Sequence, residues 1–376
     1  MRILHVLGDS EFGGGSRVVI QLCLAARQQG HEPAVLTTNP TFLQELADAD
    51  LPAVALDCIC RPIHPWRDVR GELRLHAYLK REQPDLVHTH TSKAGFLGRR
   101  AAWRAGIGAV VHTVHGFAFH EASHPVMIRA YGALETMAAR WCHRLVTVSR
   151  FHRDWALALG IAPADRLQAI PNGIAPAPRV SADDVAALRR EFGVADEEMM
   201  LVSAGRLAPG KGLEDLLIAL APLAHRPWRL ILPGTGPMAT DLPGLCRHHE
   251  LADRVVLPGF RNDVRRILAA ADLAVLPTHR EGLSIALLEA LSAGLPVLTT
   301  TIGSNLEVTR DGRAAALVPP GQPQQLGEEL ETLLTDSGRR AELSRQALAV
   351  FDEEYAEARM LSAYMDLYDE LTPPGC

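Results

Sequence analysis

The stretch Pro171-Asn172-Gly173-Ile174-Ala175-Pro176-Ala177-Pro178 divides the sequence into two halves of similar pattern. A Pro-Asn-Gly turn followed by alternating prolines is typical of a hinge rather than of a helix or a strand. The chain has 376 residues, a length that favours two domains at roughly 150 residues per domain. We therefore expect domains at residues 1–174 and 175–353, followed by a last segment at 354–376.

Short β-rich runs alternate with helical patterns on both sides of this hinge. Before it, strands are expected at residues 3–7, 33–37, 86–88, 109–114, 145–148 and 167–170, with helices at 17–29, 69–82, 94–105 and 126–141. After it, strands are expected at 200–204, 229–232, 254–257, 273–276 and 297–299, and residues 354–371 have the pattern of an amphipathic helix. This alternation predicts an α/β protein with two doubly wound, Rossmann-like parallel sheets.

The composition excludes several classes of protein. Charged residues make up 22% and hydrophobic residues 47% of the chain, which is ordinary globular usage and excludes a disordered or fibrous protein. The net charge of −6 gives no reason to expect a nucleic-acid partner. Residues 1–175 hold 19 Lys/Arg and 15 Asp/Glu, a net of +4, whereas the remainder holds 19 and 29, a net of −10. Two explanations of this charge difference are equally good. It is chance variation of surface residues, or the first domain is basic because it faces anionic lipid or a phosphorylated substrate.

The cysteines and the apolar runs predict where the protein is found. Only Cys58 and Cys60 of the six cysteines are close in sequence, and a C-x-C pair without a partner pair is no zinc pattern. The first apolar run, residues 3–7, is too short for a signal peptide, and no run approaches the roughly 20 apolar residues of a membrane span. We expect free thiols in a soluble cytoplasmic protein.

Unusual residues gather where the expected strands end, which is where open parallel sheets bind ligands. In the first half these loops are Gly13-Gly14-Gly15-Ser16, His88 to Lys93 and His112 to Gly116. In the second half they are residues 205–211, 234–237, 259–260 and 278–284. Two such edges facing each other across a hinge would form an interdomain cleft.

The glycine loop at 13–15 does not match a common cofactor motif. These glycines allow close approach of the backbone at the start of a helix, where amides favour anions. A dinucleotide site needs G-x-G-x-x-G and an acidic residue about 20 positions further on, but the second strand runs into Thr37-Thr38-Asn39. The G-K-[ST] of a phosphate-binding P-loop is also missing. No cofactor is therefore expected.

Two pairs of charged residues carry the predicted chemistry. Arg206 and Lys211 flank a Pro-Gly turn after a strand, a placement that can direct two cations at one pair of phosphates. Only three of the 38 basic residues are lysine, which makes the lysine at this loop more notable. The alternative interpretation is that Arg206 and Lys211 are two solvated surface charges. Glu281 precedes Gly282 at the start of a helix that carries Glu289. The segment thus offers carboxylates for sugar and ribose hydroxyls and free amides for phosphate, although Glu289 could also be a buried carboxylate satisfied locally.

Histidines also crowd the first half, at positions 88, 90, 112, 115, 120 and 124. They could form a metal cluster, but several stand on separate loops and no carboxylate ligands accompany them. We therefore expect no metal site, and most of these histidines should be hydrogen-bonded loop residues.

Taken together, these segments resemble the retaining glycosyltransferases of family four, which have two Rossmann-like domains in the GT-B arrangement. The resemblance covers nearly the whole chain, because the glycine loop, His115, the hinge, Arg206 with Lys211, Gly234-Thr235-Gly236-Pro237, and Glu281 with Glu289 occur in the family's order and spacing. Many relatives carry His-Asp where this chain has His115-Gly116. That departure, with His90-Thr91-Ser92-Lys93-Ala94-Gly95, resembles the branch that builds bacterial surface polysaccharides on lipid-linked carriers.

The resemblance implies roles for particular residues. Arg206 and Lys211 would bind the donor diphosphate, Glu281 the donor sugar, and His115 would touch that sugar near the reacting centre. The remaining donor contacts would come from Gly14, Gly15, Gly234, Phe260, Gly282, Leu283, Ser284 and Glu289, with the base near Phe260 and the ribose on Glu289. Candidates on the acceptor side are Ser16, His90 and Lys93. Segment 354–371 would cross back to the first, acceptor-binding domain, and residues 175–353 would bind the nucleotide sugar.

The predicted function is retaining transfer of a sugar from a UDP-linked donor to a hydroxyl of a glycan or lipid-linked glycan. The protein would work in the cytoplasm, peripherally at the inner face of the plasma membrane, with an anionic membrane surface as a further partner. Two alternatives are compatible with the same residues: a nucleotide-sugar 2-epimerase on the same fold, and a non-catalytic nucleotide-sugar-binding protein.

Overall fold

The computed structural model describes residues 1–9, 13–60 and 62–372, which form two compact units. The first unit comprises residues 1–172 together with the chain from Ala358 onward, and the second comprises Gly173–Glu357. Each unit is built on its own β-sheet, and all strand pairs in both sheets are parallel.

The first unit has a seven-stranded sheet of order β3-β2-β1-β4-β5-β6-β7. The strands are β1 (Arg2–Gly8), β2 (Glu32–Thr37), β3 (Ala53–Val54), β4 (Leu86–His90), β5 (Ala109–Val114), β6 (Arg144–Thr147) and β7 (Leu167–Ala169). The helices are α1 (Gly14–Gln28), α2 (Pro40–Asp48), α3 (Pro65–Glu82), α4 (Ser92–Ala105), α5 (Pro125–Ala139) and α6 (Arg150–Ala158), with a 3-10 turn at Ala164–Arg166.

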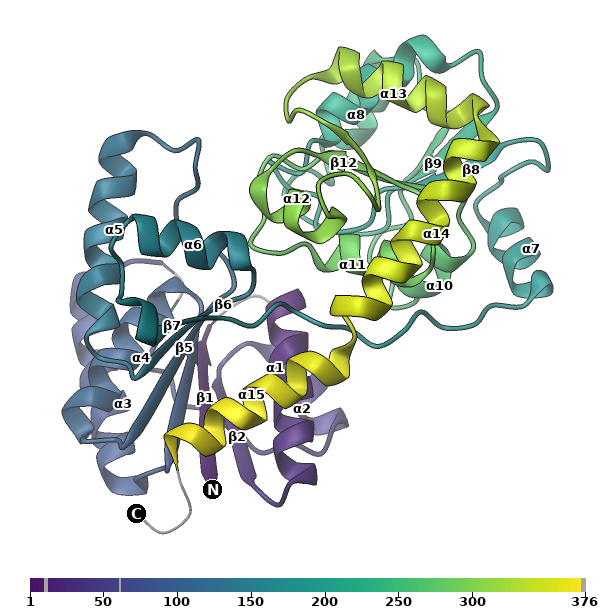
Figure 1. The fold of residues 1–376 in the computed structure, drawn as a ribbon. Helices are drawn as coiled ribbons and strands as arrows, with labels where there is room; N and C mark the ends of the chain where they lie inside the picture. Colours follow the sequence, from purple (N-terminus) through teal and green to yellow (C-terminus); the bar gives the residue numbers. More distant parts are fainter. Residues whose placement is uncertain (10–12, 61, 373–376) are drawn as a thin grey trace. The chain divides into compact units, whose positions relative to one another are not determined.

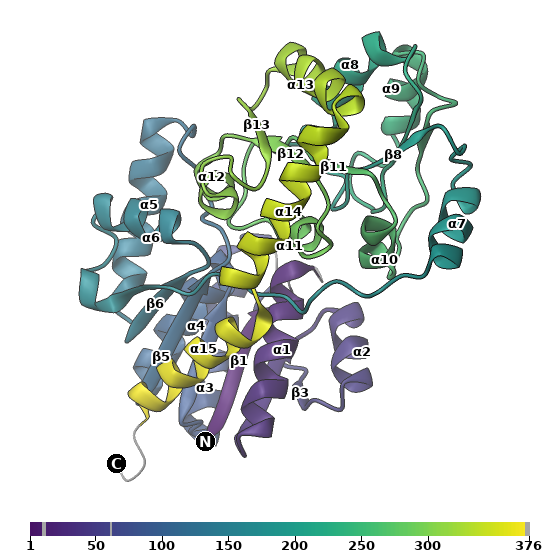
Figure 2. The ribbon, with the colours of Figure 1, turned by 45° about the vertical axis from the view of Figure 1, so that its right-hand side comes forward.

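The last helix of the chain, α15 (Glu357–Leu371), belongs to the core of this first unit. Its buried face includes Met360, Tyr364 and Tyr368, which pack against apolar residues of β1 and β4 and against α1. α15 lies beside α1 in both views of the ribbon (Figure 1 and Figure 2). The amphipathic pattern seen in the sequence therefore reflects burial against the first sheet.

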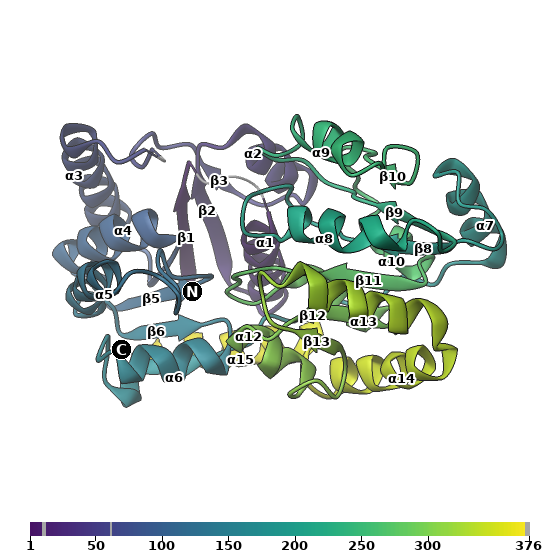
Figure 3. The same ribbon diagram turned by 90° about the horizontal axis from the view of Figure 1, so that it is seen from above.

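The second unit has a six-stranded sheet of order β10-β9-β8-β11-β12-β13. The strands are β8 (Met199–Val202), β9 (Trp228–Ile231), β10 (Val255–Val256), β11 (Leu273–Leu276), β12 (Val297–Thr300) and β13 (Ala316–Val318). The helices are α7 (Ala182–Glu191), α8 (Leu213–Leu220), α9 (Leu242–His248), α10 (Val264–Ala269), α11 (Ile285–Ser292), α12 (Gly303–Thr309), α13 (Pro323–Thr335) and α14 (Ser337–Glu354), with a 3-10 turn at Ala221–Leu223. α13 packs against both α8 and α14 (Figure 3).

The two sheets share one topology, because strand order reverses between β1 and β4 in the first and between β8 and β11 in the second. At such a reversal the following loops diverge to opposite faces and leave a crevice at the carboxyl ends of the strands. The loops after β8 and β11 carry Arg206, Lys211 and Glu281. The topology thus brings together residues about 70 positions apart.

The predicted α/β class with two Rossmann-like sheets is confirmed. The sequence did not identify β3 or β13, which have two and three residues. The closing helix begins at Glu357 rather than at 354, because Glu354 still ends α14. Tyr355 and Ala356 between the two helices run beside the hinge, where Ile174 pairs with Ala356. At Gly173 a Cβ would lie 2.7 Å from the Ala356 carbonyl oxygen, so the close pairing requires glycine there.

The five described cysteines are free thiols, and Cys376 lies outside the described residues. In the part of the chain that the structure describes, no helix combines the length and the apolar composition of a membrane span.

Candidate functional site

Three strand-end loops of the second unit are held together by their backbones. The Leu207 N–H donates to the Thr235 carbonyl at 2.8 Å, and the Gly234 N–H donates to the Gly259 carbonyl at 2.9 Å. At Gly234, with φ of +155°, a Cβ would lie 2.0 Å from the Gly205 carbonyl oxygen. Glycine is needed here both for its backbone conformation and for this close approach.

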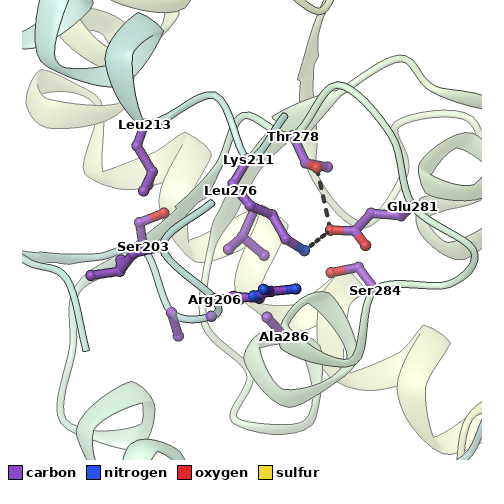
Figure 4. Close-up of a pocket in the computed structure, with 12 residues that line it drawn as sticks. Ser203, Arg206, Lys211, Leu213, Leu276, Thr278, Glu281, Ser284 and Ala286 are labelled. Carbon is purple, nitrogen blue, oxygen red and sulfur yellow. Dashed lines mark hydrogen bonds and ion pairs between the residues drawn. The ribbon is translucent and has the colours of Figure 1, made fainter. Parts of the chain in front are cut away.

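A pocket opens beside these loops, between the ends of β8 and β11 (Figure 4). Its polar wall is formed by side chains from the loops after both strands, and its apolar wall by residues of β11, α8 and α11. The lining residues are Ser203, Ala204, Gly205, Arg206, Leu207, Lys211, Leu213, Leu276, Thr278, Glu281, Ser284 and Ala286.

An ion pair between Lys211 Nζ and Glu281 Oε1 stands at the centre of the polar wall. The Thr278 hydroxyl donates to the same carboxylate oxygen at 3.2 Å, so three side chains converge on one point (Figure 4). The Lys211 side chain is 34% exposed and that of Glu281 15%, which leaves the pair accessible from the pocket. Arg206 is exposed and lies near Ser284 and Ala286 (Figure 4). Two cations and one carboxylate give this wall an excess of positive charge, which suits an anionic ligand.

The position of Lys211 depends on the tight turn at Gly212. This residue has a left-handed backbone, with φ of +67°, and a Cβ there would lie 1.9 Å from the Pro277 carbonyl oxygen. The His279 N–H donates to the Gly210 carbonyl at 2.8 Å, and the oxygen of the Thr278 hydroxyl lies 3.1 Å from the same carbonyl oxygen. These bonds hold the loops after β8 and β11 in one arrangement.

The first turn of α11 faces the same pocket. Ser284 is the N-cap residue, and its hydroxyl accepts from the Leu287 N–H at 3.3 Å. Gly282 and Leu283 precede it, and the Ser304 hydroxyl donates to the Glu281 carbonyl at 3.3 Å. Free amides at a helix start favour negatively charged ligands. Glu289 lies further along α11 and is partly buried.

The structure brings Arg206, Lys211, Glu281 and Ser284 together in this pocket. Thr278 was not among the predicted site residues, although its position directly after a strand could have identified it. Gly234 stands in an adjoining loop, and Phe260, also outside the pocket lining, is 67% exposed.

A second group of predicted residues lies in the first unit. Gly14 and Gly15 begin α1, and Ser16 is buried in its first turn. The His115 ring packs against this turn. A Cβ placed on Gly15 would lie 3.3 Å from His115 Cγ. Burial lowers the pKa of His115 to about 4, so the ring is neutral at pH 7. The Lys93 ammonium forms an ion pair with Asp68 at 2.6 Å and is thus already engaged.

Hydrogen bonds connect His115 to the interior of the first unit. His115 Nε2 lies 3.1 Å from His90 Nδ1, and His90 Nε2 lies 3.1 Å from His5 Nδ1. His5 and His90 are fully buried, and burial lowers the pKa of His5 to about 3 and that of His90 well below its usual value. His90 was predicted as an acceptor-side residue, but its nitrogens face two other histidines rather than solvent.

Neighbouring buried histidines make separate bonds. His88 Nδ1 lies 2.6 Å from the Tyr368 hydroxyl and His88 Nε2 lies 2.8 Å from the Thr113 hydroxyl, so the neutral ring donates to one hydroxyl and accepts from the other. His112 Nδ1 donates to the Thr89 carbonyl at 3.0 Å. Potential ligand atoms of His5, His88 and His90 lie within 4.8 Å of one another, a grouping that the sequence did not predict because His5 lies inside β1.

Two parallel-sheet units, with a cationic pocket at the strand reversal of the second, are features of the GT-B class of glycosyltransferases. Residues 12–177 match the family described as Glycosyltransferase Family 4, and residues 184–350 match the family described as Glycosyl transferases group 1.

The chain is also similar to individual glycosyltransferases, both in sequence and in fold. The chain is 32% identical over 320 residues to the UDP-Gal:alpha-D-GlcNAc-diphosphoundecaprenol alpha-1,3-galactosyltransferase of Escherichia coli, covering 81% of this chain and 80% of that protein. It is 28% identical to the D-inositol 3-phosphate glycosyltransferase of Xylanimonas cellulosilytica, covering 95% and 92%. The crystal structure of Anabaena Alr3699/HepE in complex with UDP and glucose superposes with a TM-score of 0.86 at 21% identity, covering 98% and 100%. The chain therefore belongs to glycosyltransferase family four and is a retaining glycosyltransferase.

Proposed function

We propose that the pocket of the second unit binds a UDP-sugar. Arg206 and Lys211 hold the diphosphate, Glu281 binds hydroxyls of the transferred sugar, and the amides of Gly282, Leu283 and Ser284 bind phosphate. Glu289 receives the ribose and Phe260 lies beside the base. The observation that carries this assignment is the convergence of Lys211, Thr278 and Glu281 at one point of a cationic pocket. The names of the galactosyltransferase relative and of the UDP-bound HepE support a uridine donor.

Opening of the Lys211–Glu281 ion pair couples binding of the donor diphosphate to binding of the transferred sugar. An arriving diphosphate offers Lys211 an anion of higher charge than a carboxylate, and the lysine turns to it. Glu281 is then left with the Thr278 hydroxyl and with oxygens free to accept from sugar hydroxyls.

In the transfer step, the bond between the sugar C1 and the diphosphate oxygen breaks while a bond from C1 to the acceptor oxygen forms on the same face. The acceptor's proton passes to the departing phosphate oxygen, so charge and atoms balance without an enzymic nucleophile. Negative charge grows on the diphosphate as it leaves. Arg206, Lys211 and the first-turn amides stabilise that charge, which is the main catalytic contribution of the protein.

We infer that the acceptor is a hydroxyl of a glycan on a lipid carrier. The Escherichia coli relative is named for an acceptor on diphosphoundecaprenol. In the first unit, Gly14, Gly15, Ser16 and His115 form the surface that would meet the sugars. Lys93, which is bound to Asp68, would first have to exchange that partner.

A lipid-linked acceptor requires contact with a membrane. The outer face of α3 has the side chains expected of a surface that binds anionic lipid. Trp66, Val69 and Leu73 follow one another at helical spacing and are 78%, 52% and 49% exposed. Arg67 and Arg70 are exposed beside them. The acidic residues in this part of the helix turn the other way: Asp68 pairs with Lys93, and Glu72 pairs with Arg100 and Arg104. An apolar stripe with arginines and without outward carboxylates inserts favourably at an anionic membrane.

Co-sedimentation with vesicles tests this surface. The wild type should bind vesicles that contain anionic phospholipid. It should not bind vesicles made only of zwitterionic phospholipid. Replacing Trp66 and Val69 with serine should weaken binding at least about tenfold, whereas Leu348→Ser, on an exposed position of α14, should have no effect. Binding that is independent of anionic lipid, or unchanged in the α3 variant, would contradict the assignment.

Turnover of site variants tests the donor site. Arg206→Ala and Glu281→Ala should each lower the rate of sugar transfer by at least about a hundredfold, as removal of a group that stabilises developing charge does. Arg247→Ala, an exposed arginine on α9 of the same unit, is the matched control. Near-normal rates in Arg206→Ala or Glu281→Ala would refute the site.

The comparisons give no support to the epimerase alternative. A direct check is incubation with UDP-sugar in the absence of acceptor. An epimerase would convert the donor to its epimer, whereas a transferase leaves the sugar configuration unchanged.

A further inference from the structure

His5, His90 and His115 form a hydrogen-bonded row with a nitrogen at each end and only one ring proton left for these two end nitrogens. Three neutral imidazoles have three ring protons, and the two bonds between them use two. The third proton must be on His5 Nε2 or on His115 Nδ1. Both of these end atoms are buried and lack a hydrogen-bond partner among the described residues. Because the inner ring, His90, both donates and accepts, the choice at one end fixes the direction of both bonds.

The start of α1 determines which end carries the proton. This helix has 15 residues, its N-cap Gly13 provides no side-chain hydrogen bond, and its first turn contains no acidic residue. The amides of that turn carry partial positive charge and need an acceptor. The His115 ring lies beside this turn, with Cγ, Nδ1 and Cδ2 at 3.3, 3.4 and 3.5 Å from the position that a Cβ on Gly15 would occupy. A lone pair on Nδ1 is favoured beside this turn, whereas an N–H there would be repelled.

We infer that His5 and His90 are positioning residues that hold His115 in the tautomer with its proton on Nε2. His115 Nε2 donates to His90 Nδ1, His90 Nε2 donates to His5 Nδ1, and His5 Nε2 carries the remaining proton in the core. His115 Nδ1 thereby stays an acceptor beside the backbone amides at the start of α1.

The arrangement also explains why two strands carry histidine in an otherwise apolar face. His5 and His88 are register partners on β1 and β4, and His90 follows two residues after His88 on the same face. Apolar side chains at these positions would fill the core without desolvating polar nitrogens. In this account His5 and His90 are retained for the orientation of His115.

Nitrogen-15 NMR of histidine-labelled protein reads the tautomers directly, because protonated and unprotonated ring nitrogens resonate far apart. His5, His90 and His115 should all carry the proton on Nε2. In His5→Leu the His90 Nε2 proton loses its acceptor, so His90 and His115 should become mixtures of tautomers. His5→Asn, whose side-chain oxygen can accept from His90, should restore the Nε2 form.

His88→Leu is the matched control, since His88 has the same burial and the paired position but bonds to Tyr368 and Thr113 instead. It should leave the His115 tautomer unchanged. A proton on His115 Nδ1 in the wild type, an unaltered His115 in His5→Leu, or an equal change in His88→Leu would overturn the inference. Stoichiometric metal bound to the purified protein would do so too, because a metal on His5 and His90 would occupy nitrogens that these bonds use.

The catalytic consequence rests on the proposed function, in which His115 stands at the sugar. His5→Leu should then lower turnover about tenfold with the donor KM changed less than twofold, as expected when a hydrogen bond is misoriented rather than when binding is lost. His5→Asn should recover most of the rate. If His115→Gln is fully active, the proposed role of His115 is wrong, whereas the NMR result still decides the inference about its tautomer.

Discussion

Acidification from pH 7 to pH 5 should destabilise the first unit through its buried histidines. His5, His88, His90, His112 and His115 all have lowered pKa values because burial disfavours the charged ring. A group with a lowered pKa in the folded state contributes stability above its unfolded pKa of about 6.5, and this stability is lost as the pH falls toward the folded value.

The size of the effect follows from the two groups with defined values. With pKa values of about 3 for His5 and about 4 for His115, both rings remain neutral in the folded protein at pH 5. Each is protonated in the unfolded chain, which costs about 2 kcal/mol per residue, or about 4 kcal/mol together. His88, His90 and His112 add to this in the same direction. Against a typical domain stability of roughly 5–15 kcal/mol, the loss is large.

Urea unfolding at pH 7, 6 and 5, followed by tryptophan fluorescence, measures this loss. Four of the five tryptophans (Trp66, Trp103, Trp141 and Trp155) belong to the first unit, so the signal reports mainly on it. His5→Gln should reduce the difference between pH 7 and pH 5 by about 2 kcal/mol, whereas His225→Gln, exposed in the second unit, should not change it. Equal stability at pH 7 and pH 5, or the same pH dependence for His5→Gln and the wild type, would show that the buried histidines do not set the acid sensitivity of the first unit.

Three further substitutions test other parts of the structure. Thr278→Val removes a hydrogen bond to Glu281 and should lower turnover about tenfold, measured by UDP release; an unchanged rate would exclude a role for the hydroxyl. Gly212→Ala places a Cβ against the Pro277 carbonyl in a left-handed conformation and should cost at least about 2 kcal/mol in urea unfolding; wild-type stability would contradict the described turn. Arg99→Met leaves a carboxylate of α5 without its buried partner and should cost about 3–5 kcal/mol, so a thermal midpoint equal to that of the wild type would be the contrary result.

The fold was predictable from sequence because both sheets are parallel and buried, and such strands appear as short apolar runs between helices. β3 and β13 were missed because both are short and begin with alanine, a residue depleted in strands. Strand order cannot be obtained from periodicity either, although the recurrent strand–helix pattern narrows it to a few arrangements.

The site was predictable to the extent that it lies at strand ends. Arg206, Lys211 and Glu281 could be identified from their positions after strands, and the order of strands β8 and β11 explains how they meet. The ion pair between Lys211 and Glu281 depends on side-chain positions that sequence spacing does not specify. The same holds for His5, whose hydrogen-bond partner His90 comes from another strand.

The anomeric configuration of the product distinguishes a retaining transferase from an inverting one. The protein would be incubated with a panel of UDP-sugars and a lipid-linked glycan acceptor, and the new glycosidic bond would be examined by proton NMR. We predict transfer with the anomeric configuration of the donor retained, accompanied by one UDP released per bond formed. An inverted product, or UDP release without any glycosidic product, would show that the protein is not a retaining sugar transferase.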